Sequence, residues 1–513
     1  MLFNSFGFLF FFLPITLAGF QLAGRVGRRA VVVWLGLMSL VFYGVWRREF
    51  LWLLCGSIVF NFVCSRLIVR WRERERWAHA AMVAGVAGNL LLLFYYKYLF
   101  PTLTGLGDLL RLHHTFAGVL LPLGISFFTF TQIGYLIDLR QGAAEPQDLP
   151  EYVLFVTFFP HLIAGPILHH SEIMPQFREQ RRYGLRADDV AVGWTWFVMG
   201  LFKKVMIADT MAPFADAAFA APYARGLLPA WVGVLSYTLQ LYFDFSGYSD
   251  MAIGLARMFS IRFPLNFASP YKAASIIDFW ARWHKTLTRY ETLYLYNPNS
   301  LAVNRRRLAE GKSVSRKGSA TLEGFASMVA FPTLVSMILI GVWHGAGIQF
   351  LLFGLFHGVY LTTNHAWRIF RAKPASQRAK PTSQAPRRRA SMNYAASVLL
   401  TMLCVIVAQV LFRADSTRGA FAMFASMAGR GGMGLDALGT LQKAMLLIPL
   451  LFLVVWTLPN TQQILRRFGS GVSTTLGTAA PRRMLLWRPA VTWGLAIAAA
   501  FIVCLAYMED TSR

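Results

Sequence analysis

The chain has 513 residues, of which 56% are hydrophobic and only 14% are charged. Ordinary soluble domains carry about 25% charged residues. This composition therefore excludes an ordinary soluble domain and indicates a polytopic membrane protein. The 50 basic residues outnumber the 24 acidic ones, and most of the excess lies in short segments between apolar runs. That distribution is typical of cytoplasmic loops and argues against nucleic-acid binding.

Apolar runs recur along the whole chain. A helix needs about 20 apolar residues to cross a bilayer, and many of these runs approach that length. We therefore expect an all-α, multi-pass transmembrane bundle. A polar, proline-rich and basic stretch at 372–391 is expected to be a cytoplasmic linker. The apolar runs lie near residues 3–23, 30–46, 49–68, 79–100, 121–139, 190–208, from about 228, 325–345, 348–367, 393–412, 443–459 and 488–507.

A polar stripe follows one face of the predicted helix that begins near residue 228. With 3.6 residues per turn, Tyr237, Gln240, Asp244 and Tyr248 share that face. Polar side chains in a membrane helix face either a bundle interior or a water-filled cavity. The stripe is therefore interpreted either as a hydrogen-bonded packing seam or as the lining of a tunnel.

Two histidines enter membrane-rich sequence from separate segments. His344 lies in an apolar run among three glycines, and His284 follows a basic, aromatic segment. A neutral imidazole has a pKa suited to general-base work near pH 7. Alone, His284 is also consistent with an interfacial histidine, and His344 with a core histidine bonded to a carbonyl. Three tryptophans lie close to them in sequence and are further candidates for the lining: Trp280, Trp283 and Trp343.

Other chemistries have no clear signal in the sequence. His169 and His170 come nearest to a metal cluster, but adjacent positions do not share a helix face, so no metal site is expected. There is no glycine-rich phosphate loop, no Gly-x-Ser-x-Gly elbow and no pair of carboxylates at catalytic spacing. The histidines therefore remain the best candidates for chemistry.

A set of motifs in one order resembles the membrane-bound O-acyltransferase family, specifically its bacterial alginate O-acetyltransferase branch. The resemblance covers roughly residues 1–460 and is carried by seven motifs. They are LPLGISFFTFTQIGYLID (121–138), FFPHLIAGPI (158–167), GLFKKVMIAD (200–209), LYFDFSGYSDMAIGLARMF (241–259), RFPLNFASPY (262–271), DFWARWH (278–284) and GVWHGA (341–346).

The resemblance implies a fold, a location and a reaction. The fold is a bundle of about eleven or more membrane helices around a central tunnel, in a bacterial inner membrane. Residues 1–460 would be the acyltransferase domain, and 461–513 a basic loop with a last membrane helix. Enzymes of this kind take an acyl group, usually from cytoplasmic acetyl-CoA, and place it on a hydroxyl outside. A periplasmic acetyltransferase partner and a polysaccharide synthesis or export complex commonly complete the pathway.

The resemblance also assigns residues. The family's catalytic histidine carries over to His344, and its second conserved polar position to His284. We expect acetyl-CoA to serve as donor substrate, with no permanently bound cofactor. Cytoplasmic basic side chains are expected to bind its phosphates, the better candidates being Lys203, Lys204, Arg282, Lys285 and Arg289.

One departure from the branch bears on the donor and acceptor. Leu293 stands where the branch has an aspartate, and a basic insertion follows at 299–317. Two alternatives stay open at this point. One is transfer of a D-alanyl or lipid acyl group from a carrier protein, and the other is a transporter or flippase whose histidines relay protons.

Overall fold

The structure, a computed structural model, describes residues 2–109, 119–179, 183–222, 226–371, 387–468 and 486–508. Within these ranges the secondary structure is helical and no strand occurs, so the all-α prediction is confirmed. The described residues form two compact units, each built from segments far apart in the sequence. Helix α12 (Leu227–Met258) contributes to both units.

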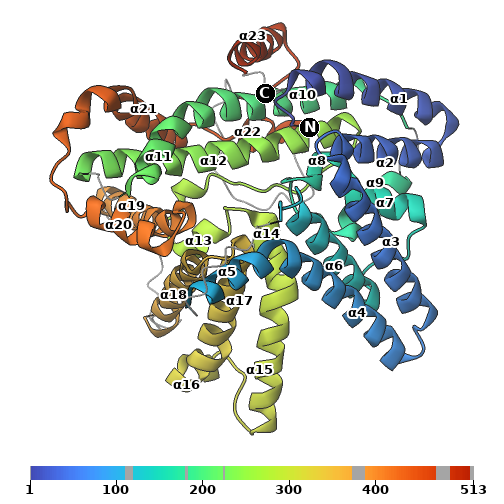
Figure 1. The fold of residues 1–513 in the computed structure, drawn as a ribbon, viewed down its shortest axis with the longest axis horizontal. Coiled ribbons are helices and arrows are strands. Elements are labelled where there is room, and N and C mark those ends of the chain that lie inside the picture. Colours follow the sequence, from blue (N-terminus) through green and yellow to red (C-terminus); the bar gives the residue numbers. More distant parts are fainter. Residues whose placement is uncertain are drawn as a thin grey trace. The chain divides into compact units, whose positions relative to one another are not determined.

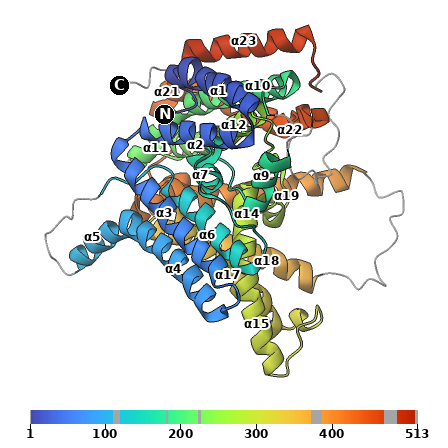
Figure 2. The ribbon, with the colours of Figure 1, turned by 90° about the vertical axis from the view of Figure 1, so that its right-hand side faces the viewer.

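The first unit comprises Met1–Thr210, Tyr242–Asn266 and Pro459–Arg513. Within it, α3, α4 and α6 pack side by side (Figures 1 and 2). Besides its part of α12, its helices are η1 (Phe8–Phe12), α1 (Leu13–Val26), α2 (Arg28–Gly44), α3 (Arg48–Arg70), α4 (Glu75–Phe94), η2 (Tyr95–Leu99), α5 (Phe100–Leu109), α6 (Ile125–Gln141), α7 (Leu149–Thr157), α8 (Phe159–Leu162), α9 (His170–Glu179), α10 (Ala187–Phe202), η3 (Lys203–Ala208), α22 (Thr461–Ile464), η11 (Arg466–Phe468) and α23 (Val491–Tyr507).

The second unit comprises Met211–Leu241 and Phe267–Leu458 and holds both histidines singled out above. Its helices α17 and α18 lie side by side (Figure 1). Besides its part of α12, its helices are α11 (Asp209–Ala220), η5 (Pro270–Lys272), α13 (Ile276–Trp280), α14 (Lys285–Glu291), η6 (Thr292–Tyr296), α15 (Asn297–Ala309), η7 (Gly318–Ala320), α16 (Leu322–Phe325), η8 (Ala326–Ala330), α17 (Phe331–His344), α18 (Ile348–Phe370), α19 (Arg387–Arg413), α20 (Thr417–Met427), η10 (Leu435–Ala437) and α21 (Leu438–Thr457).

Seven helical segments in the described ranges are both long and apolar enough to cross a membrane. Helices also cover the other predicted apolar runs, so the multi-pass prediction is confirmed. Three parts of the prediction remain predictions: the number of membrane helices, eleven or more; the central tunnel; and the domain boundary at residue 460. Residues 372–386 of the predicted linker lie outside the described residues, and 387–391 begin α19. The seven segments are Phe8–Val26, Arg48–Arg70, Glu75–Gly105, Ala187–Ala220, Leu322–His344, Met392–Arg413 and Leu435–Thr457.

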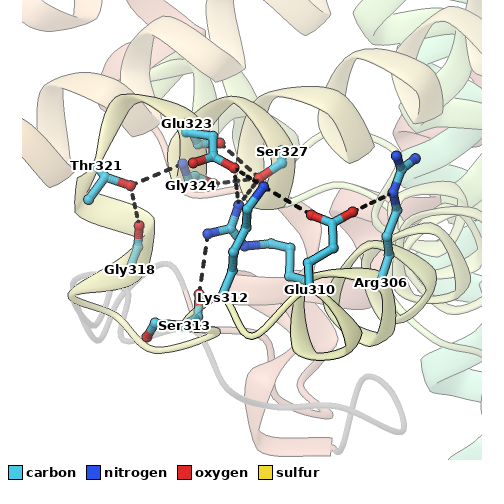
Figure 3. Close-up of polar contacts among 10 residues, drawn as sticks. Arg306, Glu310, Lys312, Ser313, Gly318, Thr321, Glu323, Gly324 and Ser327 are labelled. Atoms are coloured by element: carbon cyan, nitrogen blue, oxygen red, sulfur yellow. Dashed lines mark hydrogen bonds and ion pairs between the residues drawn. The ribbon is translucent and has the colours of Figure 1, made fainter.

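The basic insertion folds into a helical hairpin, residues 297–327, which we call the basic arm. Its helix α15 continues directly from α14 and η6, and the chain returns through η7 and α16. Charged and hydroxyl groups join the two sides of the arm (Figure 3). Arg307 lies buried between them, and its guanidinium contacts Glu323 at 3.4 Å and donates to the Ser327 hydroxyl at 2.9 Å. The arm is therefore an ordered element of the second unit.

Candidate active site

His344 is the last residue of α17, and aromatic rings surround it. The helix ends because Gly345 adopts an extended backbone, with φ of −169°. The ring of His344 lies 4.7 Å from that of its neighbour Trp343, 4.9 Å from Phe412 and 5.8 Å from Phe353. No Asp, Glu, Lys or Arg occurs between residues 331 and 347 in the sequence. The imidazole is half-buried, and rings line its surroundings.

Two glycines bring α17 and α18 close together next to His344. A Cβ atom added at Gly341 would lie 2.3 Å from the Phe350 carbonyl oxygen, and one at Gly354 would lie 2.3 Å from that of Met337. Real Cβ atoms do not approach this closely, so only glycine fits at these crossing points. Small residues permit such close helix packing in membrane proteins. The glycines thus hold Phe353 of α18 against the end of α17.

His284 occupies a tight turn between α13 and α14. It is 2% exposed, and its backbone is in the left-handed region, with φ of 43° and ψ of 51°. A residue other than glycine in this region carries a conformational cost of about 1–3 kcal/mol, and such residues cluster at functional sites. His284 lies outside the seven candidate spans, and burial lowers its pKa to about 3. The imidazole is therefore neutral near pH 7.

The turn that carries His284 is anchored through Trp280 and Trp283. Trp283 stacks on Phe279 at 5.6 Å and lies edge-on to Phe267 at 5.1 Å. The Trp280 indole N–H donates to Nδ1 of His357 on α18 at 3.3 Å. Sequence reasoning did not single out His357, because a lone histidine in an apolar helix carries no distinguishing pattern.

A connected set of rings, which we call the ring cluster, runs through this region. Phe353 is its central member, because it contacts His344, Phe412 and, at 4.7 Å, His357. Trp280 joins through His357, with ring centroids 5.0 Å apart. The ring cluster consists of Trp280, His344, Phe353, His357 and Phe412.

The polar stripe lies on α12, as predicted, but its members belong to different units. In the second unit, Tyr237 contacts the Arg413 guanidinium at 5.9 Å, and Gln240 lies on the same portion of α12. In the first unit, Asp244 pairs with Lys204 at 2.7 Å, and Tyr248 stacks on Phe3 at 4.9 Å. Whether the stripe lines a tunnel stays a prediction.

Several of the basic candidates for phosphate binding have carboxylate partners. In the first unit, the Lys203 ammonium lies 2.5 Å from Asp250, and Lys204 pairs with Asp209 at 2.7 Å. In the second unit, Arg282 pairs with Asp278 at 2.7 Å. Lys203 and Lys204 thus belong to one unit, while Arg282, Lys285 and Arg289 belong to the other with both histidines.

Lys285 differs from the paired residues. It follows His284 directly, and burial, aided by the positive charge of Arg289, lowers its pKa. Among the described residues no ion pair to Lys285 occurs, so burial disfavours its charged form. Its role in binding the donor stays a prediction.

The comparison with protein families decides the identity. The sequence pattern of the membrane-bound O-acyltransferase family matches residues 32–314, more than half of the chain. The chain belongs to this family. The assignment as an O-acyltransferase and as a multi-pass membrane protein follows from it, in agreement with the motifs of the sequence.

Individual relatives extend the family match to most of the chain. The peptidoglycan O-acetyltransferase of Helicobacter pylori is 36% identical over 464 residues, 85% of this chain and 81% of the relative. The probable alginate O-acetylase AlgI of Pseudomonas aeruginosa is 36% identical over 447 residues, 85% of this chain and 77% of the relative. The teichoic acid D-alanyltransferase of Bacillus subtilis is 26% identical over 252 residues, 49% of this chain and 60% of the relative.

Proposed function

We propose that this O-acyltransferase moves an acetyl group from cytoplasmic acetyl-CoA to a hydroxyl of an exported polysaccharide, or to a periplasmic partner that carries the group onward. The enzyme would work in a bacterial inner membrane. Family membership and two relatives named as O-acetylating enzymes support this reading. The observation that carries it is the placement of His344 at a helix end, in ring-lined surroundings.

In the proposed reaction His344 acts as general base. Its imidazole takes the proton of the acceptor hydroxyl while the oxygen attacks the thioester carbonyl. This attack forms the new C–O bond, and the tetrahedral intermediate then collapses by re-forming the carbonyl and breaking the C–S bond, which leaves the ester. The proton held by His344 then passes to the departing CoA thiolate, so the enzyme returns to its starting state.

His284 supplies the second role in the proposal. As a neutral imidazole it carries one ring N–H, which can donate to the oxyanion that develops on the acyl carbonyl. Lys285 and Arg289, which follow it on α14, would hold the CoA phosphates. Orientation of donor and acceptor supplies the remaining acceleration, worth about 7–11 kcal/mol in favourable cases.

The test is turnover of acetyl-CoA by the purified protein, followed as release of free CoA thiol. We expect His344→Ala to lower kcat by about 10²–10⁴-fold, the usual contribution of a general base. His79→Ala changes an exposed histidine on α4 and is the matched control. Equal turnover by wild type and His344→Ala would overturn the assignment of His344.

A carrier-protein donor is the second candidate, because the Bacillus subtilis relative is a teichoic acid D-alanyltransferase. The same assay with D-alanyl carrier protein separates the two donors. Turnover of that donor with none of acetyl-CoA would replace the acetyl proposal. Turnover of neither, with a folded protein, would point to a different acyl donor.

A further inference from the structure

His357 is a buried histidine to which the proposed reaction assigns no role. It is 2% exposed, lies in the middle of α18 and has rings on several sides. Its Nδ1 accepts a hydrogen bond from the Trp280 indole, which is itself only 7% exposed. A nitrogen that accepts cannot carry the ring proton, so the proton of the neutral imidazole lies on Nε2. This hydrogen bond therefore defines one tautomer and one ring orientation.

Trp280 connects this hydrogen bond to the turn of His284. The Trp280 carbonyl accepts from the Thr288 hydroxyl on α14 at 3.3 Å, so both ends of the turn meet at this residue. The turn is also held by backbone hydrogen bonds from the amides of Ala281 and Trp283 to the carbonyls of Ile277 and Phe279. Because His284 has a left-handed backbone, its orientation depends on how firmly the flanking turn is held.

His357 is connected to the other histidine through Phe353. Phe353 precedes it by one helical turn, and its ring contacts both His344 and His357. Helix α18 therefore presents neighbouring residues to the His344 segment and to the His284 turn. All of these residues lie within the second unit.

We propose that His357 is a positioning residue, whose Nδ1 holds the Trp280 indole and so fixes the His284 turn to the helix that packs against His344. The proposal rests on the roles given to His284 and His344 above. A buried indole N–H that loses its acceptor has no solvent to replace it, so the turn would shift to find one. Displacement of a reacting group by about 1 Å can lower a rate about 100-fold.

Amide substitutions separate positioning from simple packing. In His357→Asn the side-chain oxygen can stand where Nδ1 stood, whereas in His357→Gln it reaches toward the place of Nε2. His357→Phe keeps an aromatic ring but removes the acceptor. We expect His357→Phe and His357→Gln to lower kcat about 10- to 100-fold with little change in KM for acetyl-CoA, and His357→Asn to recover most of the activity.

The reciprocal substitution tests the same hydrogen bond from its other end. Trp280→Phe removes the donor and keeps an aromatic ring. If the two residues act through their hydrogen bond, the double variant Trp280→Phe/His357→Phe should be no slower than either single variant. His365→Phe makes the same change two turns further along α18 and is the matched control.

Amide hydrogen exchange of residues 276–290 provides a readout that does not depend on turnover. We expect His357→Phe to speed exchange of this segment about tenfold or more, and His357→Asn to restore protection. If wild type fails to use acetyl-CoA, the proposed function falls while exchange still decides the positioning role. Unchanged exchange in His357→Phe, or equal losses in His357→Asn and His357→Gln, would overturn that role.

Discussion

The ring cluster and the basic arm belong to the same unit but are held together by opposite means. In the ring cluster, aromatic and imidazole rings meet at 4.7–5.8 Å, and one hydrogen bond joins Trp280 to His357. In the basic arm, ion pairs join side chains that are mostly open to solvent. Arg306 is 84% exposed where it pairs with Glu310, and Glu323 is 64% exposed where it pairs with Lys312.

The difference predicts where substitutions matter. A buried polar group that loses its partner costs about 1–3 kcal/mol, whereas an exposed ion pair contributes about 0–1 kcal/mol. We therefore expect the placement of the proposed catalytic groups to depend on the ring cluster. We expect the basic arm to tolerate exchange of most of its charges.

After that of His344, the largest expected effect is at His284, in the left-handed turn that Trp280 of the ring cluster anchors. His284→Ala removes the proposed donor to the developing oxyanion, and we expect kcat to fall about 10²–10³-fold. His284→Asn keeps an amide donor and tolerates the left-handed backbone, so it should retain more activity than the alanine variant. Acetyl-CoA turnover measures both. Equal activity of His284→Ala and wild type would remove His284 from the site.

Glu291 lies in the sequence between the His284 turn and the basic arm, and its titration gives a second test of what burial does in this unit. It ends α14, outside the candidate spans, and burial raises its pKa from 4.5 to about 7, while the Ser336 hydroxyl acts in the opposite direction. The folded state then binds more protons than the unfolded state between these pH values. The free energy of unfolding therefore falls as pH rises through this window.

Glu291→Gln should remove that pH dependence. We expect the variant to gain stability relative to wild type from pH 5 to pH 8, by up to about 3 kcal/mol, which corresponds to the shift in pKa. Thermal unfolding in one detergent at several pH values measures the difference. Glu73→Gln changes an exposed carboxylate and should give no comparable trend. A difference that does not depend on pH would contradict the shifted pKa of Glu291.

The sequence was sufficient to predict the fold class, because apolar runs determine membrane helices. The predicted run at 325–345 corresponds closely to the segment Leu322–His344. The run from about 228 is the start of the long helix α12. By contrast, the continuous helix from α14 through α15 was not predicted. The segment from α14 to α15 is rich in basic and polar residues and lacks the long apolar run that predicts a membrane helix. Its η6 and α15 portions instead contact α17 and η8.

The candidate site was predictable only where a motif marked it. His284 and His344 stand in motifs of the family, and the structure places both in one unit. His357 has an apolar context that resembles that of a core histidine. Its importance depends on the Trp280 indole, 77 positions away in the chain, and no periodicity reports such a contact. The ion pairs of Lys203 with Asp250 and of Lys204 with Asp209 were not predicted either, because they depend on how the chain folds.

Within the basic arm, Arg307 is the charged residue whose substitution we expect to destabilise the arm. Its side chain is 8% exposed and contacts Ser327, Glu323 and the Ser313 carbonyl. Arg307→Met keeps much of the volume but removes these hydrogen bonds, and we expect a local loss of roughly 1–2 kcal/mol. Faster amide exchange or proteolysis between residues 310 and 327 would report it. Unaltered protection of this segment would contradict the role of Arg307.

The smallest effect is expected one position earlier, at Arg306. Arg306→Ala removes an ion pair to Glu310 on the solvent-facing side of α15, where Lys312 also pairs with Glu310 at 2.9 Å. Because Lys312 remains, Glu310 keeps a cationic partner. Exchange and proteolysis of the arm should therefore match wild type, and turnover should be unchanged. If Arg306→Ala loosened the arm as much as Arg307→Met, burial would not be what distinguishes the two arginines, and net charge would be the better explanation of the arm's order.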